Sequence, residues 1–425
     1  IAVHSEADAG SLHVEMADEA HPIGRAPARE SYLVGETILD VARASRADAI
    51  HPGYGFLAEN AEFARAVIAA GLIWVGPHPK TIEDMGDKER ARDIAKSAGV
   101  PVLPGSPRFA ENDLVGLAEA AEGVGYPVLV KAAAGGGGIG MRPVRDPEAL
   151  VGLVEGVQAV AKRTFGDGTV YLEHYIPRAR HVEVQVFGFG DGRVVHLYER
   201  DCSIQRRFQK IVEESPAPAV PEDLRENMKA AATALSRHER YAGAGTVEFI
   251  VDPEKRAFFF LEMNTRIQVE HPVTEMVTGL DLVAMQIDLA RNALPVVNQS
   301  EIRRAGHAIE SRIYAENPSK NFFPSPGRLE VYRLPAESES IRIETGFRQG
   351  DEVTPHYDPL IAKVICRAAT REQAIDDMLG AMEATEIRGV NTNVEFLARV
   401  LRHDAFRTGR TSTAFVEEFR AELVT

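Results

Sequence analysis

Short apolar runs alternate with amphipathic stretches along the first hundred residues. Strands this short, separated by helices, indicate a parallel sheet with helices on its faces. One predicted helix carries clear end signals, with Asn60 as its N-cap and Gly71 just beyond its last turn. Because the chain opens inside a strand, we expect the first βα unit of this domain to be missing. The predicted strands are 1–4, 47–50 and 72–75, and the predicted helices are 36–46 and 60–70.

The hydrophobic pattern changes after a passage rich in Pro and Gly at 76–79. A predicted helix at 87–98 follows, and a compact block at 103–175 surrounds a run of glycines. From 176 onward, alternating apolar and polar positions predict mostly strands. In the compact block the predicted strands are 127–132 and 141–144, and the predicted helix is 147–162. In the last part the predicted strands are 181–188, 193–200, 244–251 and 256–263, and the helices are 222–238 and 281–292.

These patterns predict a multidomain fold that combines the α/β and α+β classes. Residues 1–75 form an N-terminal parallel α/β domain that is incomplete at its start, and 76–102 form a linker with a helix. Residues 103–175 form a small domain around the glycine run. Residues 176–425 form a larger mixed α+β C-terminal domain.

Composition narrows the class of protein. The chain has 425 residues, 44% of them hydrophobic, and a net charge of −15, which argues against a partner that is nucleic acid or a membrane surface. Cys202 and Cys366 are the only cysteines and lack zinc spacing, so we expect a reduced, cytoplasmic compartment. No apolar run reaches the roughly 18 residues of a transmembrane helix, and the start does not resemble a signal peptide. These features predict a soluble enzyme.

The run of four glycines at 135–138 is the densest chemical signal. Its spacing matches the G-x-G-x-x-G dinucleotide fingerprint, but a strand and not a helix is predicted to follow. A P-loop is excluded because no Gly-Lys-Ser/Thr sequence is present there. The remaining alternatives are a flexible surface hairpin and a flap whose backbone amides face phosphate oxygens. We favour the flap, because Lys131 ends the preceding apolar strand and adds a fixed positive charge.

A predicted hairpin at 244–263 carries a pair of acids. Folding it about residue 255 places Glu248 opposite Glu262 on one face, with Asn264 two residues further along that face. Facing acids repel unless a cation lies between them, and oxygen ligands of this kind suit Mg²⁺ or Mn²⁺. Two solvated glutamates are the alternative, but the neighbouring apolar residues favour a metal site.

A second polar group follows the hairpin directly. Arg266, Gln268 and Glu270 alternate along a predicted extended segment, so their side chains project to one side. A guanidinium can bind an oxyanion while a nearby carboxylate acts as a base. A surface ion pair is the alternative. The basic run at 199–210 has two interpretations: a solvated charged segment, or a wall that binds an anion. His181 also has two interpretations, a core histidine or a residue that contacts a ligand.

With these elements in this order, the sequence resembles a biotin carboxylase of the ATP-grasp superfamily, essentially end to end. The resemblance implies an N-terminal α/β domain, an ATP-grasp lid at 103–175 and a larger C-terminal domain. The motifs that carry it are HPGYGFLAEN (51–60), MGDKERA (85–91), VKAAAGGGGIGM (130–141), RHVEVQV (180–186), ERDCSIQRRFQK (199–210), EESPAP (213–218), EMNTRIQVEHPVTEM (262–276), GHAIESRIYAE (306–316) and PSPG (324–327).

The resemblance implies a two-step reaction, the first half-reaction of an acyl-CoA carboxylase. ATP and bicarbonate form carboxyphosphate, and the carboxyl group then passes to N1′ of biotin on a carrier protein. PSPG at 324–327 favours the acyl-CoA branch over a pyruvate or urea carboxylase. The implied partners are a biotin carboxyl carrier protein, a carboxyltransferase subunit and a second copy of the chain in a homodimer.

The resemblance also assigns roles to individual residues. Glu270 takes the proton of bicarbonate and Arg312 stabilises the ureido oxygen of biotin, with Lys210 and Arg266 as further catalytic residues. The residues implied to bind bicarbonate or biotin are Lys210, Arg266, Gln268, Val269, Glu270, Arg312 and Tyr54. Those implied to bind ATP are Lys88, Lys131, Gly136, Gly137, Gly138, Glu173, Tyr175, Ile176, His181, Gln205, Glu248 and Glu262. Mg²⁺ or Mn²⁺ is assigned to Glu248, Glu262 and Asn264.

The sequence departs from the family pattern in three places. Phe208 stands where many members carry a polar residue, which predicts an altered nucleotide contact. Ile139 replaces a basic residue of the glycine loop and Ala134 replaces a glycine. We also expect the opening strand of the family, its loop and the next helix to be missing. Two alternatives remain: another ATP-grasp ligase that forms carboxyphosphate, or a non-catalytic scaffold that binds the carrier protein.

Overall fold

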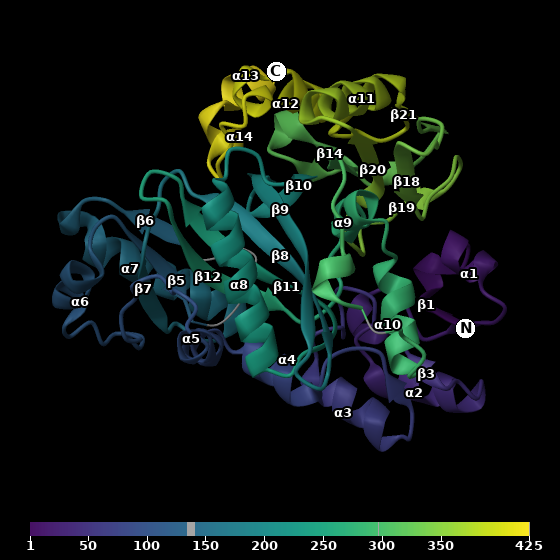
Figure 1. The fold of residues 1–425 in the computed structure, drawn as a ribbon, viewed down its shortest axis with the longest axis horizontal. Helices are drawn as coiled ribbons and strands as arrows, with labels where there is room; N and C mark the ends of the chain where they lie inside the picture. Colours follow the sequence, from purple (N-terminus) through teal and green to yellow (C-terminus); the bar gives the residue numbers. More distant parts are fainter. Residues whose placement is uncertain (134–140, 296, 425) are drawn as a thin grey trace.

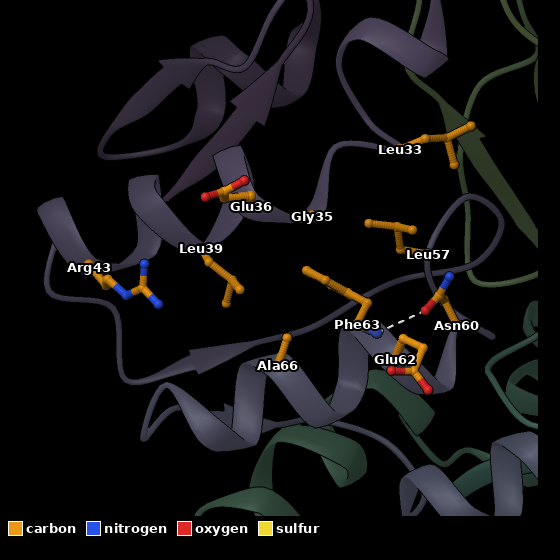
Figure 2. Close-up of a pocket in the computed structure, with 10 residues that line it drawn as sticks. All are labelled: Leu33, Gly35, Glu36, Leu39, Arg43, Leu57, Asn60, Glu62, Phe63 and Ala66. Atoms are coloured by element: carbon orange, nitrogen blue, oxygen red, sulfur yellow. Dashed lines mark hydrogen bonds between the residues drawn. The ribbon is translucent and has the colours of Figure 1, made fainter.

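The computed structural model describes residues 1–133, 141–295 and 297–424 (Figure 1). In the N-terminal part, two pairs of parallel strands are present, as the alternating pattern predicts. Asn60 caps the helix that follows it by accepting a hydrogen bond from the backbone N–H of Phe63 at 2.8 Å (Figure 2), and Gly71 has a φ of 78°. The elements are β1 (Ala2–His4), α1 (Leu12–Met16), β2 (Ala20–Pro22), α2 (Gly35–Ala44), β3 (Ala49–Ile50), α3 (Ala61–Ala69) and β4 (Ile73–Trp74).

The next part forms a separate lobe beside the main body of the molecule (Figure 1). Its three-stranded antiparallel sheet has the order β6-β5-β7, and α7 packs against it around a core that includes Val130, Val154 and Leu172. The predicted glycine flap, including Gly136, Gly137 and Gly138, lies outside the described residues. The elements of the lobe are α6 (Leu117–Val124), β5 (Val128–Ala132), β6 (Arg142–Val144), α7 (Leu150–Phe165) and β7 (Val170–His174), while α4 (Pro79–Gly86) and α5 (Lys88–Ser97) precede it and pack on α3 and β12 (Ala257–Asn264) respectively.

One antiparallel sheet of eight strands runs through the rest of the molecule, in the order β12-β11-β8-β9-β10-β13-β20-β18. The direct pairing of β10 with β13 makes the sheet continuous from β12 to β18. Its strands are β8 (Arg180–Phe189), β9 (Val194–Arg206), β10 (Gln209–Ser215), β11 (Ala242–Asp252), β12 (Ala257–Asn264), β13 (His307–Tyr314), β18 (Ile341–Thr345) and β20 (Leu360–Ala368).

The basic run at 199–210 belongs to this sheet. The strand predicted to end at residue 200 continues to Arg206, and a tight turn at Arg207 and Phe208 leads into β10. Arg200 is fully buried and Arg206 nearly so, so the solvated interpretation is wrong for these two residues. Each is paired with a buried carboxylate, of Glu183 and Glu316 respectively, which offsets the cost of removing the guanidinium from water.

Helices cover both halves of the large sheet. α8 (Glu222–His238), predicted with the same boundaries, packs on β8 and β9, while α11 (Arg371–Ala384) packs on β20 (Figure 1). The other helices are α9 (His271–Thr278), α10 (Leu282–Ala290), α12 (Val394–Arg402), α13 (Asp404–Arg407), α14 (Phe415–Glu418) and α15 (Arg420–Leu423). The short strands are β14 (Glu316–Asn317), β15 (Phe323–Pro324), β16 (Gly327–Arg328), β17 (Val331–Arg333), β19 (Glu352–Val353) and β21 (Glu386–Arg388).

The two cysteines of the sequence, Cys202 and Cys366, are buried, and both are free thiols. Within the described ranges, a helix with the length and apolar character needed to cross a membrane is not found.

Candidate active site

A cavity of about 460 Å³ lies between the small three-stranded sheet and one face of the large sheet. Among the described residues predicted for the site, only Tyr54 is outside its lining. The predicted residues that line it are Lys88, Lys131, Glu173, Tyr175, Ile176, His181, Gln205, Lys210, Glu248, Glu262, Asn264, Arg266, Gln268, Val269, Glu270 and Arg312.

A second cavity, of about 370 Å³, lies between α2 and α3 in the N-terminal part (Figure 2). Leu39 and Phe63 face it from the two helices, and the charged side chains of Glu36, Arg43 and Glu62 stand at its edges. It contains none of the residues predicted for the site. The first cavity is therefore the candidate active site.

Positive charge gathers at the end of the cavity formed by β5 and α5. Lys131 Nζ lies 2.7 Å from Oε2 of Glu173 on the neighbouring strand, and Arg92 of α5 pairs with the other oxygen of Glu173. Burial disfavours the ammonium of Lys131, but Glu173 outweighs it and raises the pKa of Lys131. Burial and the charge of Lys131 together lower the pKa of Lys88. Three cations around one carboxylate suit a multiply charged anion such as a phosphate chain.

The acid pair of the hairpin forms as predicted. Glu248 on β11 and Glu262 on β12 are direct cross-strand partners. Loss of solvation at the cavity wall and then the charge of Glu248 raise the pKa of Glu262, so a cation between the two acids would relieve this repulsion. The two carboxylates therefore fit a divalent metal ion. Asn264 donates its amide to Glu248 at 2.7 Å, while its amide oxygen accepts a hydrogen bond from Arg266 at 3.1 Å.

His181 is both buried and part of the cavity wall. Its Nε2 lies 2.8 Å from Oε2 of Glu248, and its Nδ1 lies 2.8 Å from the side-chain nitrogen of Gln205. Burial disfavours the imidazolium, but the charge of Glu248 raises the pKa of His181. The two interpretations of this histidine are therefore not exclusive, because a core position on β8 also faces the acid pair.

Lys210 connects the acid pair to the rest of the site. Its Nζ lies 2.6 Å from Glu183, 2.7 Å from Glu248 and 2.8 Å from Glu270. Burial disfavours the ammonium, but the three carboxylates raise the pKa of Lys210 well above its usual value. The sequence prediction missed Glu183, although it lies two residues after His181 on the same face of β8.

Glu270 is buried and ionised between two cations. Oε1 contacts Lys210 at 2.8 Å and Oε2 contacts Nη2 of Arg312 at 2.8 Å. Burial alone would raise the pKa of Glu270, but these two cations hold it well below its usual range. A ligand that draws Lys210 or Arg312 away from Glu270 would raise the pKa of Glu270 again. A general base needs such a raised pKa in order to accept a proton.

The group around Arg266 also converges on the cavity. Arg266 contacts Gln268 at 3.3 Å and pairs with Glu59 of the N-terminal part at 2.7 Å. Between β12 and α9 the backbone is not a strand, so the predicted extended geometry is wrong. The side chains meet nevertheless, because Glu59 and Asn264 hold the guanidinium in place. Glu59 was missed, although it lies in the HPGYGFLAEN motif that the sequence singles out.

Phe208 lies at the edge of the cavity and is 60% exposed. It occupies the turn between β9 and β10 with a φ of 65°, a backbone conformation that non-glycine residues rarely adopt. Tyr54, the predicted site residue outside the cavity lining, is 42% exposed.

Family models match most of the chain in three consecutive parts. The model of the biotin carboxylase N-terminal domain matches 1–82, and the model of the biotin carboxylase C-terminal domain matches 310–418. Between them, the ATP-binding domain of the carbamoyl-phosphate synthase L chain matches 87–295.

Curated relatives resemble the chain along its whole length. A biotin carboxylase of Halalkalibacterium halodurans is 50% identical over 422 residues, which cover 98% of this chain and 91% of that protein. The mitochondrial methylcrotonoyl-CoA carboxylase subunit alpha of Dictyostelium discoideum is 48% identical over 424 residues, 100% of this chain and 60% of that protein. The chain thus spans about three fifths of the length of this alpha subunit.

Solved structures show the same similarity. The biotin carboxylase domain dimer of Hydrogenobacter thermophilus 2-oxoglutarate carboxylase, in complex with MgADP, ADP and bicarbonate, has a TM-score of 0.93 and 45% identity, covering 100% of this chain and 92% of that one. A Campylobacter jejuni biotin carboxylase in a β,γ-ATP complex has a TM-score of 0.92 and 41% identity, covering 98% and 92%. With its cavity, its three matched models and these relatives, the chain belongs to the biotin carboxylase family.

Proposed function

We propose that this chain catalyses the ATP- and bicarbonate-dependent carboxylation of biotin on a carrier protein, the first half-reaction of an acyl-CoA carboxylase. The observation that carries the proposal is the placement of Glu270 between Lys210 and Arg312, in the cavity that also holds the acid pair and the cationic end. This arrangement offers a base, an oxyanion site and a phosphate site within one enclosure. The bicarbonate and MgADP named for the Hydrogenobacter thermophilus domain fit these sites by charge.

Nucleotide binding uses the cationic end of the cavity. Lys131 and Lys88 hold the phosphates, and Lys131 exchanges its contact with Glu173 for a phosphate oxygen. Glu248 and Glu262, assisted by Asn264, would hold Mg²⁺ or Mn²⁺, which supplies positive charge to the phosphate oxygens when bound. Tyr175 and Ile176 line the cavity beside Glu173 and offer a surface for the adenine base, while His181 and Gln205 lie on the ribose side.

Bicarbonate binds among Lys210, Arg266 and Gln268 and the backbone of Val269. Lys210 then neutralises the anion and draws away from Glu270, whose pKa rises so that it accepts the proton of bicarbonate. The resulting oxygen attacks the γ-phosphorus of ATP, the bond to the bridging oxygen breaks, and ADP and carboxyphosphate form.

Carboxyphosphate divides into CO₂ and phosphate beside the biotin ring. The phosphate takes the proton of N1′, and the ureido nitrogen attacks CO₂ to give carboxybiotin. Arg312 donates hydrogen bonds to the ureido oxygen as negative charge develops there. Tyr54, exposed outside the cavity lining, is proposed to contact biotin as it enters.

We infer that the partners are a biotin carboxyl carrier protein or domain and a carboxyltransferase subunit, with the chain itself in a homodimer in the cytoplasm. The relatives named as methylcrotonoyl-CoA carboxylase alpha subunits support the acyl-CoA branch. The fold similarity to a 2-oxoglutarate carboxylase domain and to Rhizobium etli pyruvate carboxylase keeps a keto-acid carboxylase as the second candidate. Carboxylation of a purified biotinylated carrier, followed by acyl-CoA or pyruvate addition with the cognate carboxyltransferase, separates the two.

The first test is Mg²⁺-dependent ADP release with bicarbonate, with and without free biotin. Release that biotin stimulates and that Glu270→Gln abolishes supports the proposed reaction. Glu275→Gln is a matched control, because Glu275 is a buried, ion-paired acid of α9 outside this cavity. Release that needs bicarbonate but ignores biotin would instead indicate a different carboxyphosphate-forming ligase. Absence of release despite nucleotide binding would favour a scaffold.

A further inference from the structure

Two glutamates behind the active site have no role in the steps above. Glu213 on β10 and Glu310 on β13 are direct cross-strand partners, and both are fully buried. None of their four carboxyl oxygens has a hydrogen-bond partner among the described residues. Neither glutamate is part of the cavity lining. Buried acids side by side are costly when both are ionised, so such a pair needs a physical explanation.

Glu213 has one ion-pair partner within the described ranges, the catalytic Arg312. Nε of Arg312 lies 2.7 Å from Oε1 of Glu213, and Nη2 of the same guanidinium lies 2.8 Å from Oε2 of Glu270. Arg312 is therefore held by two carboxylates, one in the cavity and one behind it. Since Arg312 follows Glu310 by two residues on β13, all three side chains share one face of the sheet.

The charges around the pair favour one proton, held by Glu310, with Glu213 ionised beside Arg312. Burial raises the pKa of Glu213 to about 7 against the opposing charge of Arg312, and burial raises the pKa of Glu310 well above its usual value. Lys363 on β20 and Arg312 are the cations that lower the pKa of Glu310, but Nζ of Lys363 contacts the Val269 carbonyl and Glu344, each at 2.6 Å. The other charged groups that face the pair are Lys210, Glu183 and Glu270.

We propose that Glu213 is the positioning residue of Arg312, and that Glu310 is a neutral carboxylic acid that supports Glu213 from the adjacent strand. The inference rests on the proposed function, in which Glu270 becomes protonated by bicarbonate. At that moment Arg312 loses one of its two carboxylate partners. Glu213 lies outside the cavity lining and keeps its charge above about pH 7, so the guanidinium stays directed at the ureido oxygen while biotin reacts.

The test compares Glu213→Gln and Glu310→Gln in the same chain, with Glu275→Gln as control. We expect Glu213→Gln to lower kcat/KM for free biotin about ten- to a hundredfold, because the guanidinium loses its buried ion-pair partner. ADP release without biotin stays near the wild-type rate, because Lys210 and Glu270 are unchanged and Arg312 keeps its contact with Glu270. Glu310→Gln keeps both rates, since an amide replaces a neutral acid of the same shape. The infrared C=O band of a protonated carboxyl group disappears in Glu310→Gln.

Three results would overturn the inference. They are an unchanged kcat/KM for biotin in Glu213→Gln, an equal loss of both activities in that variant, or a Glu310→Gln variant as impaired as Glu213→Gln. Should Glu213→Gln fail to fold in a thermal melt, Glu213→Asp withdraws the carboxylate from Arg312 but keeps its charge, and the same selective loss is expected. A wild-type enzyme that ignores biotin would refute the proposed function instead, which distinguishes the two failures.

Discussion

The ammonium of Lys131 lies 2.7 Å from a carboxylate oxygen of Glu173 on the neighbouring strand, inside the cavity where we place the phosphates of ATP. Both side chains are largely buried, so the interaction is only weakly screened by water. A nucleotide must therefore compete with Glu173 for the same cation. This competition leads to the first prediction.

Glu173→Gln is expected to tighten MgADP binding several-fold, because Lys131 and Arg92 lose their shared carboxylate partner and remain positively charged. Lys131→Met is expected to weaken binding about tenfold or more, since a hydrogen bond to a charged group is removed. Isothermal titration with MgADP measures both. Glu89→Gln, which changes an exposed acid paired with Arg108, serves as the control. Weaker binding by Glu173→Gln would show that Glu173 itself holds the nucleotide.

Removing either acid of the hairpin is expected to raise the Mg²⁺ concentration needed for half-maximal ADP release. The shift should be at least the roughly tenfold that loss of an outer-shell partner of a metal costs. Glu248→Gln should shift it more than Glu262→Gln, because Lys210 and His181 also depend on Glu248. Mg²⁺ titrations of the two variants provide the measurement. Identical Mg²⁺ curves for the wild type and both variants would place the metal elsewhere.

Glu214 is expected to stabilise the fold in a pH-dependent way. Burial opposes its ionisation, but His307 and Arg371 lower the pKa of Glu214 from 4.5 to about 2. A carboxylate with a depressed pKa contributes stability above its unfolded pKa, and this contribution of about 3 kcal/mol is lost as pH falls from about 4.5 towards 2.

Urea unfolding of Glu214→Gln tests this at neutral and acidic pH. The variant should be less stable than the wild type at pH 7, and the difference should shrink below about pH 4.5. Glu383→Gln, at an exposed acid paired with Arg402, should show little difference at either pH. If the difference in the free energy of unfolding between Glu214→Gln and the wild type stays constant through the acidic range, the pH-dependent role of Glu214 is contradicted.

Asn393 is expected to support the strand that carries Arg312. Its side chain donates to the Arg312 carbonyl at 3.0 Å and accepts from the Tyr314 N–H at 2.8 Å, and it is fully buried. Asn393→Ala leaves both backbone groups without these partners, at a cost of about 2 kcal/mol or more in the free energy of unfolding. Urea unfolding measures the loss, with the exposed Asn391→Ala as the neighbouring control. Equal stability of the two variants would refute this role.

Features that depend on neighbouring residues were predicted well from the sequence. The cap at Asn60, the helix at 222–238 and the pairing of Glu248 with Glu262 are all present. The cap follows from a hydrogen bond within one turn, and the helix follows from the helical period of its apolar residues. The pairing of the two acids follows from the position of the hairpin turn. Such interactions involve short stretches of chain, and their patterns are visible in the order of the residues.

The charged residues of β9 show where this reasoning fails. In the sequence, Arg200 and Arg206 belong to a basic run that a solvated segment would also explain. In the structure, both are buried within the sheet. Their partners Glu183 and Glu316 are 17 and 110 residues away along the chain. Nothing in the local pattern indicates such partners, so a buried arginine cannot be distinguished from a solvated one by spacing alone.

The sequence by itself determined part of the strands and helices, the acid pair and the motifs that identify the family. Only the tertiary structure decided which charges are buried and what each one contacts, including Lys131 with Glu173 and Arg312 with Glu213. The physical reason is that burying a charge is tolerated only beside a compensating group. In this protein those groups come from strands far apart in the chain, and the eight-stranded sheet brings them together.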